Sequence, residues 1–272
     1  MKANNITISI NSRCSMKCPY CISNMTFKIV PNNNWFEINL KRAVNVAKRA
    51  NISHCLITSK GEPTNNPKML SKVMHAFKNF PIEVQTHYGS KYLSNDIIDI
   101  FYSHILNVLA ISIDHPAQIE KGFIWDKLSC LPWTIRLAVV LTNNFKGWRL
   151  MDFIEFCKQQ KIEQLTIRNP TIPTNYQRTE LSLNTVNWIN QNINNEQYIA
   201  ITKELALLIE SGKAHFIRDL HFGAKVYDID GIGFVHMDYC VEEQNGEIMR
   251  SLIYQSDGHM YTSWDYPGSI LW

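Results

Sequence analysis

The sequence predicts an α/β fold built on a mostly parallel sheet. In the first 170 or so residues, six short apolar segments with strand character are separated by helical or long connecting segments. Repeated alternation of strand and helix favours parallel strands joined by right-handed crossovers. Beyond about residue 173 the pattern changes to two helices followed by short strands, which predicts a C-terminal α+β extension.

The six predicted strands are short, apolar and followed by polar or turn-forming residues. They cover residues 6–10, 54–58, 82–86, 108–113, 135–141 and 164–167. The carboxyl ends of such parallel strands meet on one side of the sheet, where α/β proteins carry their functional residues. The residues that follow each strand are therefore the first candidates for a site.

The intervening helices are predicted from apolar residues at helical spacing. They cover residues 36–50, a segment from residue 68 with Pro67 in its first turn, residues 94–102 with Ser94 as cap, and residues 148–160.

In the extension, helices are predicted for residues 183–195 and 198–211, the second ended by Gly212. Strands are predicted for residues 225–229, 233–237, 249–255 and 259–263, with turns at Asp230–Gly231 and Asp257–Gly258. We expect residues 174–272 to form an antiparallel β-rich layer that covers a substrate cavity in residues 1–173.

Composition narrows the class of protein. The chain has 272 residues, of which 45% are hydrophobic, enough for a large core. It has no apolar run long enough for a membrane span and no secretory signal at its start. Seven cysteines, three of them in one loop, favour a reducing, cytoplasmic location. The scattered charge of +3 gives no strong case for nucleic-acid binding.

The three clustered cysteines, Cys14, Cys18 and Cys21, directly follow the first strand. Three soft thiolates in one loop indicate a metal. No fourth Cys or His occurs within about the next thirty residues, so the loop does not supply a closed four-ligand zinc site by itself. An iron-sulfur cube held by three thiolates keeps one iron open for a chelating molecule. A zinc loop completed from elsewhere and metal-free reduced thiols are the alternatives.

This C-x3-C-x-aromatic-C run, with Tyr20 as the aromatic residue, resembles the signature of the radical S-adenosylmethionine (SAM) superfamily. The resemblance implies a partial (β/α)6 barrel over about residues 5–170 and a [4Fe-4S] cluster whose open iron is chelated by SAM. Reductive cleavage of SAM then gives a 5'-deoxyadenosyl radical that abstracts hydrogen from a substrate. It also implies that Tyr20 lies beside the adenine.

A second motif, Gly61, Glu62 and Pro63, follows the second strand and resembles the family's G-G-E-P. The resemblance implies that these residues bind SAM, with Glu62 on its ammonium group. Lys60 stands where the first glycine is usual and could alter the loop or bring a cation near the cofactor carboxylate. The alternative is a plain surface turn.

Softer matches lie at later strand ends. Ser112 and Asp114 resemble an S-x-D of the family, which implies that Ser112 contacts SAM and that Asp114 faces the cavity; a core hydroxyl is the alternative for Ser112. Arg136 is predicted to form a structural ion pair. Arg168, at the end of the sixth strand, is a candidate contact of cofactor or substrate.

The extension offers candidates for substrate binding, each with a structural alternative. Cys240 or Tyr239 is a candidate hydrogen-atom donor, unless Cys240 is a buried structural residue. The aromatic residues Trp264, Tyr266 and Trp272 suit stacking on a nucleobase or a small hydrophobic core. Four carboxylates are candidates for binding a substrate amine, and the alternative is that they are solvated side chains at strand ends: Asp228, Asp230, Asp238 and Glu242.

The function predicted is that of a radical SAM enzyme with a single [4Fe-4S] cluster, served by a reductant such as flavodoxin or ferredoxin. The aromatic residues favour a nucleotide, nucleoside or nucleic-acid base as substrate. A peptide or protein substrate, including glycyl-radical activation, is the alternative. A non-catalytic metal-binding module is the alternative from another class.

Overall fold

The computed structural model describes residues 2–10, 13–89, 92–120, 123–193, 195–220, 224–237, 248–264 and 266–272. Its strands form one 11-stranded sheet in the order β11-β10-β1-β2-β3-β4-β5-β6-β9-β8-β7. The strands are β1 (Lys2–Ser9), β2 (His54–Thr58), β3 (Ile82–His87), β4 (Val108–Ile113), β5 (Thr134–Val140), β6 (Gln164–Arg168), β7 (Ala214–Asp219), β8 (Lys225–Ile229), β9 (Ile232–Met237), β10 (Ile248–Tyr254) and β11 (Met260–Tyr261).

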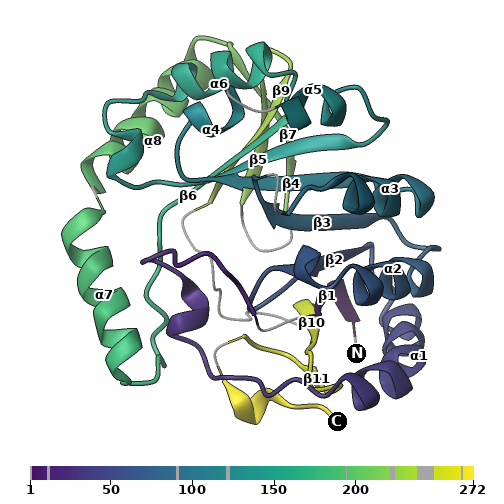
Figure 1. Ribbon diagram of the computed structural model, residues 1–272. Helices are drawn as coiled ribbons and strands as arrows, with labels where there is room; N and C mark the ends of the chain where they lie inside the picture. Colours follow the sequence, from purple (N-terminus) through teal and green to yellow (C-terminus); the bar gives the residue numbers. More distant parts are fainter. Residues whose placement is uncertain are drawn as a thin grey trace.

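The helices surround this sheet as Figure 1 shows, with α1, α2 and α3 along one side and α7 on the opposite side, beside the loop that follows β1. Their bounds are α1 (Asn33–Arg49), α2 (Pro67–Ala76), α3 (Asn95–Ser103), α4 (Ala117–Glu120), α5 (Phe123–Leu128), α6 (Leu150–Gln159), α7 (Glu180–Asn192) and α8 (Asn195–Glu210). Short 3-10 turns are η1 (Ile22–Asn24), η2 (Pro63–Asn65), η3 (Asn143–Phe145) and η4 (Pro267–Ser269).

Strands β1 to β6 are mutually parallel and lie in sequence order, as predicted. Their two faces differ in chemistry because side chains alternate along a strand. One face is apolar and packs into the main core, as Ile57, Ile111 and Ile167 do. The sheet does not close on itself, since β11 and β7 end the strand order. The predicted fold class, an open α/β barrel with added C-terminal elements, is confirmed.

The other face carries polar residues that pair with one another. Arg136 donates from Nη1 to Glu83 Oε2 at 2.7 Å and from Nε to Gln164 Oε1 at 2.8 Å. Gln85 also donates to Glu83, at 3.0 Å. The predicted structural ion pair of Arg136 is therefore confirmed, and it links β3, β5 and β6 across the interior face.

Helix ends follow the predicted signals in most places. Asn66 caps α2 by accepting a hydrogen bond from Met69 N, and Pro67 occupies the first turn. Gly212 has φ +69 directly after α8, the left-handed conformation that ends a helix without strain. Ser94 precedes α3 but makes no side-chain capping hydrogen bond.

The C-terminal strands differ from the expected separate layer. The antiparallel pairs β7–β8, β8–β9 and β10–β11 form, but β9 pairs in parallel with β6 and β10 pairs in parallel with β1. Without these partners, β1 and β6 would be the open edges of a six-stranded sheet, and pairing satisfies their backbone groups. Strand β7 was missed because five of its six residues are exposed, so it lacks an apolar pattern.

Cys55 and Cys157 are both fully buried in the main core, where they pack as small apolar residues. Among the described residues, no helix combines the length and the hydropathy that crossing a membrane requires.

Candidate active site

The cysteine loop leaves the carboxyl end of β1, and its thiols lie close enough to influence one another. Burial raises the pKa of the Cys18 thiol to about 12, and the negative charges of Asp114, Cys21 and Cys14 add to this shift. The backbone N–H of Cys21 donates to the Cys18 oxygen at 3.1 Å, so the chain turns between them. All three thiols are free of disulfides.

The donor set of this loop fits an iron-sulfur cluster by its chemistry. Three thiols on one short turn are the ligands that such a cluster uses, and metal coordination replaces the proton that burial would otherwise retain on Cys18. Within the described part of the chain, however, no three Cys, His, Asp or Glu side chains meet at metal-ligand distances. That spacing applies to a single metal ion, whereas each thiolate of a [4Fe-4S] cluster binds a different iron atom.

The turn after β2 packs directly against the start of the cysteine loop. Glu62 N donates to the backbone oxygen of Arg13 at 3.0 Å. A Cβ atom built on Gly61 would lie 2.2 Å from the same oxygen. Only glycine allows this approach, because a Cβ at that distance overlaps the Arg13 carbonyl. The motif predicted to hold SAM thus also positions the cysteine loop.

The carboxylate of Glu62 is buried, with 4% of the residue exposed, and accepts several hydrogen bonds. Its Oε1 accepts from Thr64 N at 3.1 Å, from Thr64 Oγ1 at 2.8 Å and from Thr86 Oγ1 at 2.7 Å. Its Oε2 accepts from His87 N at 3.2 Å. Burial raises the pKa of Glu62, while these hydrogen bonds oppose the shift. Glu62 therefore joins the turn after β2 to the end of β3.

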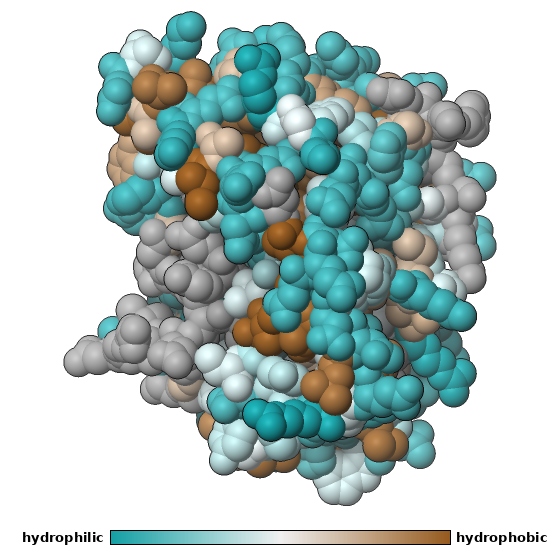
Figure 2. Space-filling view, turned by 90° about the vertical axis from the view of Figure 1, so that its left-hand side faces the viewer, coloured by the Kyte–Doolittle hydropathy of each residue, from teal (hydrophilic) through white to brown (hydrophobic). Residues whose placement is uncertain are grey.

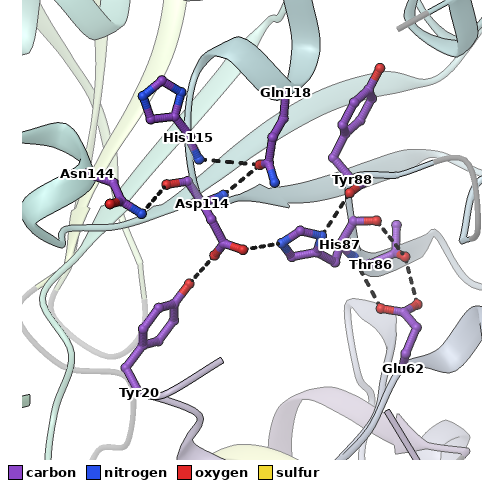
Figure 3. Close-up of polar contacts among 9 residues, drawn as sticks. All are labelled: Tyr20, Glu62, Thr86, His87, Tyr88, Asp114, His115, Gln118 and Asn144. Carbon is purple, nitrogen blue, oxygen red and sulfur yellow. Dashed lines mark hydrogen bonds and ion pairs between the residues drawn. The ribbon is translucent and has the colours of Figure 1, made fainter. Parts of the chain in front are cut away.

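A chain of side chains continues from β3 to the cysteine loop (Figure 3). His87 Nε2 lies 3.1 Å from Asp114 Oδ2, and Tyr20 Oη donates to Asp114 Oδ1 at 2.5 Å. His87 Nδ1 lies 2.8 Å from the Tyr88 oxygen. Asn144 donates to the Asp114 backbone oxygen at 3.0 Å. The structure thus brings together Tyr20, Glu62 and Asp114, which were predicted separately.

The charges of this network follow from its geometry. Both ring nitrogens of His87 face acceptors, a carbonyl and a carboxylate, so the imidazolium, which has two N–H donors, fits best. Burial alone would lower the pKa of His87, but the hydrogen bond and charge of Asp114 raise it overall. The pKa of Asp114 is lowered, chiefly by the hydrogen bond from His87. Burial and the bond to Asp114 raise the pKa of Tyr20.

Helix α7 packs on the other side of the cysteine loop. The ring of Trp188 lies 5.6 Å from that of Tyr20, and Asn24 Nδ2 donates to Thr185 Oγ1 at 3.1 Å. Figure 2 shows the side of the molecule on which α7 lies, a mostly hydrophilic face with apolar patches along its middle. No local sequence pattern indicates that α7 belongs to the site, because these contacts are tertiary.

Lys60, which replaces the usual glycine, extends toward backbone oxygens. Its Nζ donates to Phe27 O at 2.5 Å, to Trp264 O at 3.2 Å and to Thr26 Oγ1 at 3.1 Å. It also lies 4.0 Å from the centre of the Phe27 ring. This cation therefore connects the segment after the cysteine loop with the C-terminal segment.

The remaining site predictions have different outcomes. Ser112 lies on the interior face beside His87, its register partner on β3. Pro63 begins η2 and is buried. Cys240, Tyr239, Asp238 and Glu242 lie outside the described residues.

The other C-terminal candidates make structural contacts. Asp230 pairs with Lys158, and Asp228 accepts from Gly231 N at 3.1 Å within a turn. Trp264 packs against the small core of Phe27, Ile29, Ile253 and Tyr261. Trp272 lies beneath Arg42, whose guanidinium carbon is 4.0 Å from the ring centre. A hollow of about 480 Å³ between α1 and Trp272 is lined by other residues than those of the Asp114 network. For Trp264 and Trp272, the packing alternative fits better than stacking on a nucleobase.

Comparison with known proteins identifies the fold. The sequence matches no model of a known protein family and no curated protein. Among solved structures, SuiB of Streptococcus suis is 13% identical, with a TM-score of 0.60 over 96% of this chain and 60% of SuiB. SuiB bound to S-adenosylmethionine is 13% identical, with a TM-score of 0.59 over 96% of this chain and 60% of that one.

A third structure, SuiB bound to its precursor peptide SuiA, is 12% identical, with a TM-score of 0.59 over 96% of this chain and 59% of that one. The chain thus spans about three-fifths of the length of SuiB. At this identity the likeness shows a common fold. The protein therefore has an open, mostly parallel α/β fold like that of SuiB, in agreement with the partial barrel expected from the sequence.

Proposed function

We propose that the protein is a radical SAM enzyme that modifies a peptide. The observation that carries the proposal is the seating of the three-cysteine loop on the turn of Gly61 and Glu62. Both motifs lie at the carboxyl ends of neighbouring parallel strands, β1 and β2. The fold is shared with SuiB, which has been solved with S-adenosylmethionine bound.

Cys14, Cys18 and Cys21 would hold the [4Fe-4S] cluster, with SAM on the open iron. When bound, the cluster supplies the electron that cleaves SAM to a 5'-deoxyadenosyl radical. The chain's own residues position these groups: the backbone of Gly61 and Glu62 holds the cysteine loop against β2. Ser112 remains a candidate contact of SAM.

A part-buried network lies beside the loop. In it Asp114 accepts hydrogen bonds from Tyr20 and from His87, so two fixed donors offset its charge. Cys240 remains a candidate hydrogen-atom donor to a substrate radical. An electron-transfer protein such as flavodoxin or ferredoxin is the proposed reductant.

A peptide is the proposed substrate because SuiB, which shares the fold, has been solved with a precursor peptide bound. Stacking by the C-terminal aromatic residues was one support of the nucleotide interpretation, beside the mixed charge of the extension and its lack of extra cysteines. Trp264 and Trp272 are packed against other side chains, so that support is weakened. The peptide alternative is therefore preferred to the nucleotide reading.

The cofactor chemistry is tested by anaerobic reconstitution with iron and sulfide, reduction with dithionite in the presence of SAM, and assay for 5'-deoxyadenosine. We expect the product from the unaltered protein and from Cys130→Ala, a matched control in which an exposed cysteine is removed. Cys18→Ala should give none. A protein that binds zinc, takes up no iron and leaves SAM intact would instead be a metal-binding module.

The substrate class is tested in the same assay. Peptides encoded next to the gene and a mixture of nucleosides and nucleotides are added separately to the reduced enzyme. A peptide that increases 5'-deoxyadenosine formation and changes in mass supports the proposal. The same response to a nucleoside or nucleotide, with none to peptides, would support a nucleoside or nucleotide as the substrate instead.

A further inference from the structure

Arg168 ends β6 on the interior face of the sheet. Leu165 and Ile167 are buried in the main core, so the alternating residues Thr166 and Arg168 point to the opposite face. This is the face that carries the interior ion pair of Arg136 and, at the strand ends, His87. Arg168 is therefore directed to the side where the Asp114 network lies.

The strand register places Arg168 level with Asp114. Ile113 pairs with Val139, which pairs with Ile167, and one residue further on Val140 pairs with Arg168. Asp114 follows Ile113, so it lies in the same row, two strands from Arg168. Two strand spacings separate their backbones by roughly 10 Å. Both carboxylate oxygens of Asp114 already bond Tyr20 and His87, so Asp114 does not pair with Arg168.

The guanidinium of Arg168 lacks a partner in the part of the chain that the structure describes. Its Nε is buried and makes no hydrogen bond there. Arg136, deeper on the same face, shows the usual arrangement: its Nε donates to Gln164 and its Nη1 to Glu83. A guanidinium is always charged, and its buried N–H donors normally have hydrogen-bond partners. Arg168 thus has an unused donor next to the site.

We propose that Arg168 binds a carboxylate of the substrate. Its Nε–H and one Nη–H form a fork that matches the two oxygens of a carboxylate in a side-on bidentate pair. This inference deepens the proposed function: the peptide presents an aspartate, a glutamate or its terminal carboxylate to the end of β6. Lysine cannot replace this fork, because its ammonium lacks the planar pair of donors.

SAM also carries a carboxylate, and the topology separates the two sources. The cysteine loop, where SAM would bind the open iron, follows β1, whereas Arg168 ends β6 on the far side of β2, β3, β4 and β5. The cysteine loop is held at β2 by Gly61 and Glu62. This separation along the strand order favours a second molecule as the source of the carboxylate, and the test includes SAM as the other source.

The test observes the Arg168 side chain itself. The full-length protein, reconstituted anaerobically, is labelled with 15N-arginine, and the Nε–Hε resonance of Arg168 is assigned by its loss in Arg168→Lys. N-acetylglutamate α-amide is the probe and N-acetylglutamine α-amide its uncharged match. We expect a saturable shift with the glutamate compound alone. Because Arg168→Lys removes the reporting resonance, its affinity for the glutamate compound is measured by calorimetry and should be about tenfold or more weaker. The Nε–Hε resonance of Arg136 should stay in place as an internal control.

Other results would overturn the proposal. Equal shifts with the glutamine compound, or none with either, would show that the side chain selects no carboxylate. A shift by SAM that decarboxylated SAM does not cause would assign the site to the cofactor. A third result would be that the glutamate compound shifts the Arg168 resonance in Asp238→Asn but not in the unaltered protein. The chain itself would then supply the carboxylate that Arg168 binds. None of these readouts requires SAM cleavage. A protein that binds the carboxylate but does not cleave SAM, or the reverse, would therefore be recognised.

Discussion

Lys60 and Trp264 are joined by a hydrogen bond of 3.2 Å although they lie 204 residues apart in the sequence. The same ammonium also donates to Phe27 O, so one side chain holds two distant segments against β2. Exchange to methionine keeps an unbranched side chain, one atom shorter, but removes the donors. Each oxygen that loses the Lys60 donor must then bind water or remain without a hydrogen bond, at a cost of about 1–3 kcal/mol.

We therefore expect Lys60→Met to lower the free energy of unfolding in urea by about 1–3 kcal/mol. Lys72→Met is the matched control, because Lys72 forms only an exposed pair with Glu37 at 2.6 Å. Such pairs contribute about 0–1 kcal/mol. Equal midpoints for the two variants would contradict the connecting role of Lys60.

Gly61→Ala should disturb the cysteine loop. The new Cβ would lie 2.2 Å from the Arg13 oxygen, a backbone atom that cannot turn away without moving the loop. Overpacking by a methylene costs about 1–3 kcal/mol in a core, and this overlap is larger. We expect the variant to take up less iron and sulfide per chain on reconstitution than the unaltered protein.

Gly233→Ala serves as the control for that variant, since its Cβ would make only ordinary contacts, the nearest at 3.6 Å from Gln164 Cγ. It should load the cluster normally. If Gly61→Ala loaded equally well, the close approach to Arg13 would be unnecessary for the site.

Tyr20→Phe separates the hydroxyl from the ring. The ring contact with Trp188 is retained, while Asp114 loses one of its donors. Hydrogen bonds to a charged group contribute about 1.5–3 kcal/mol, so unfolding should be easier by that amount. Tyr102→Phe, at a side chain that is 63% exposed, should change urea stability by less than about 0.5 kcal/mol. A Tyr20→Phe protein as stable as the parent would mean that water replaces the hydroxyl.

His87 should make stability depend on pH. Its pKa is raised in the folded protein by the hydrogen bond and charge of Asp114, which outweigh burial. The stabilisation is therefore complete below the unfolded-state pKa of about 6.5 and is lost as the pH rises through the higher folded-state value. The pKa of Asp114 is lowered, so its own contribution is lost only in acid, outside this window.

His87→Gln can still donate one hydrogen bond to Asp114 but carries no charge. We expect the difference in unfolding free energy between the parent and this variant to be largest near about pH 6 and to shrink by about pH 8.5. The measurement is urea unfolding of both proteins at the two pH values. A difference that does not change with pH would show that His87 is neutral in the folded state.

The sequence predicted the central part of the fold well because its signals are local. Apolar runs marked β1 to β6, and Pro67 and Gly212 marked helix ends with specific backbone requirements. The partners of β9 and β10 could not be predicted, since pairing depends on which sheet edges are open after folding. The exposed strand β7 carries no apolar pattern at all.

For the site, the sequence supplied the motifs but not their connections. Asp114 and Tyr20 were each singled out, yet their hydrogen bond joins residues 94 positions apart. The place of Trp188 beside Tyr20 and the direction taken by Lys60 arise from packing between elements. Local patterns identify which residues are chemically unusual, whereas the contacts among them depend on tertiary structure.

The parallel pairing of β10 with β1 affects the order in which the protein can mature. Strand β1 gains its second neighbour only when residues such as Leu252, the partner of Ile6, have been made. Contacts between such distant parts of a chain form slowly. The thiols that follow β1 are thus translated long before the strand that supports them. We expect metal insertion to follow the synthesis of β10 rather than that of β1.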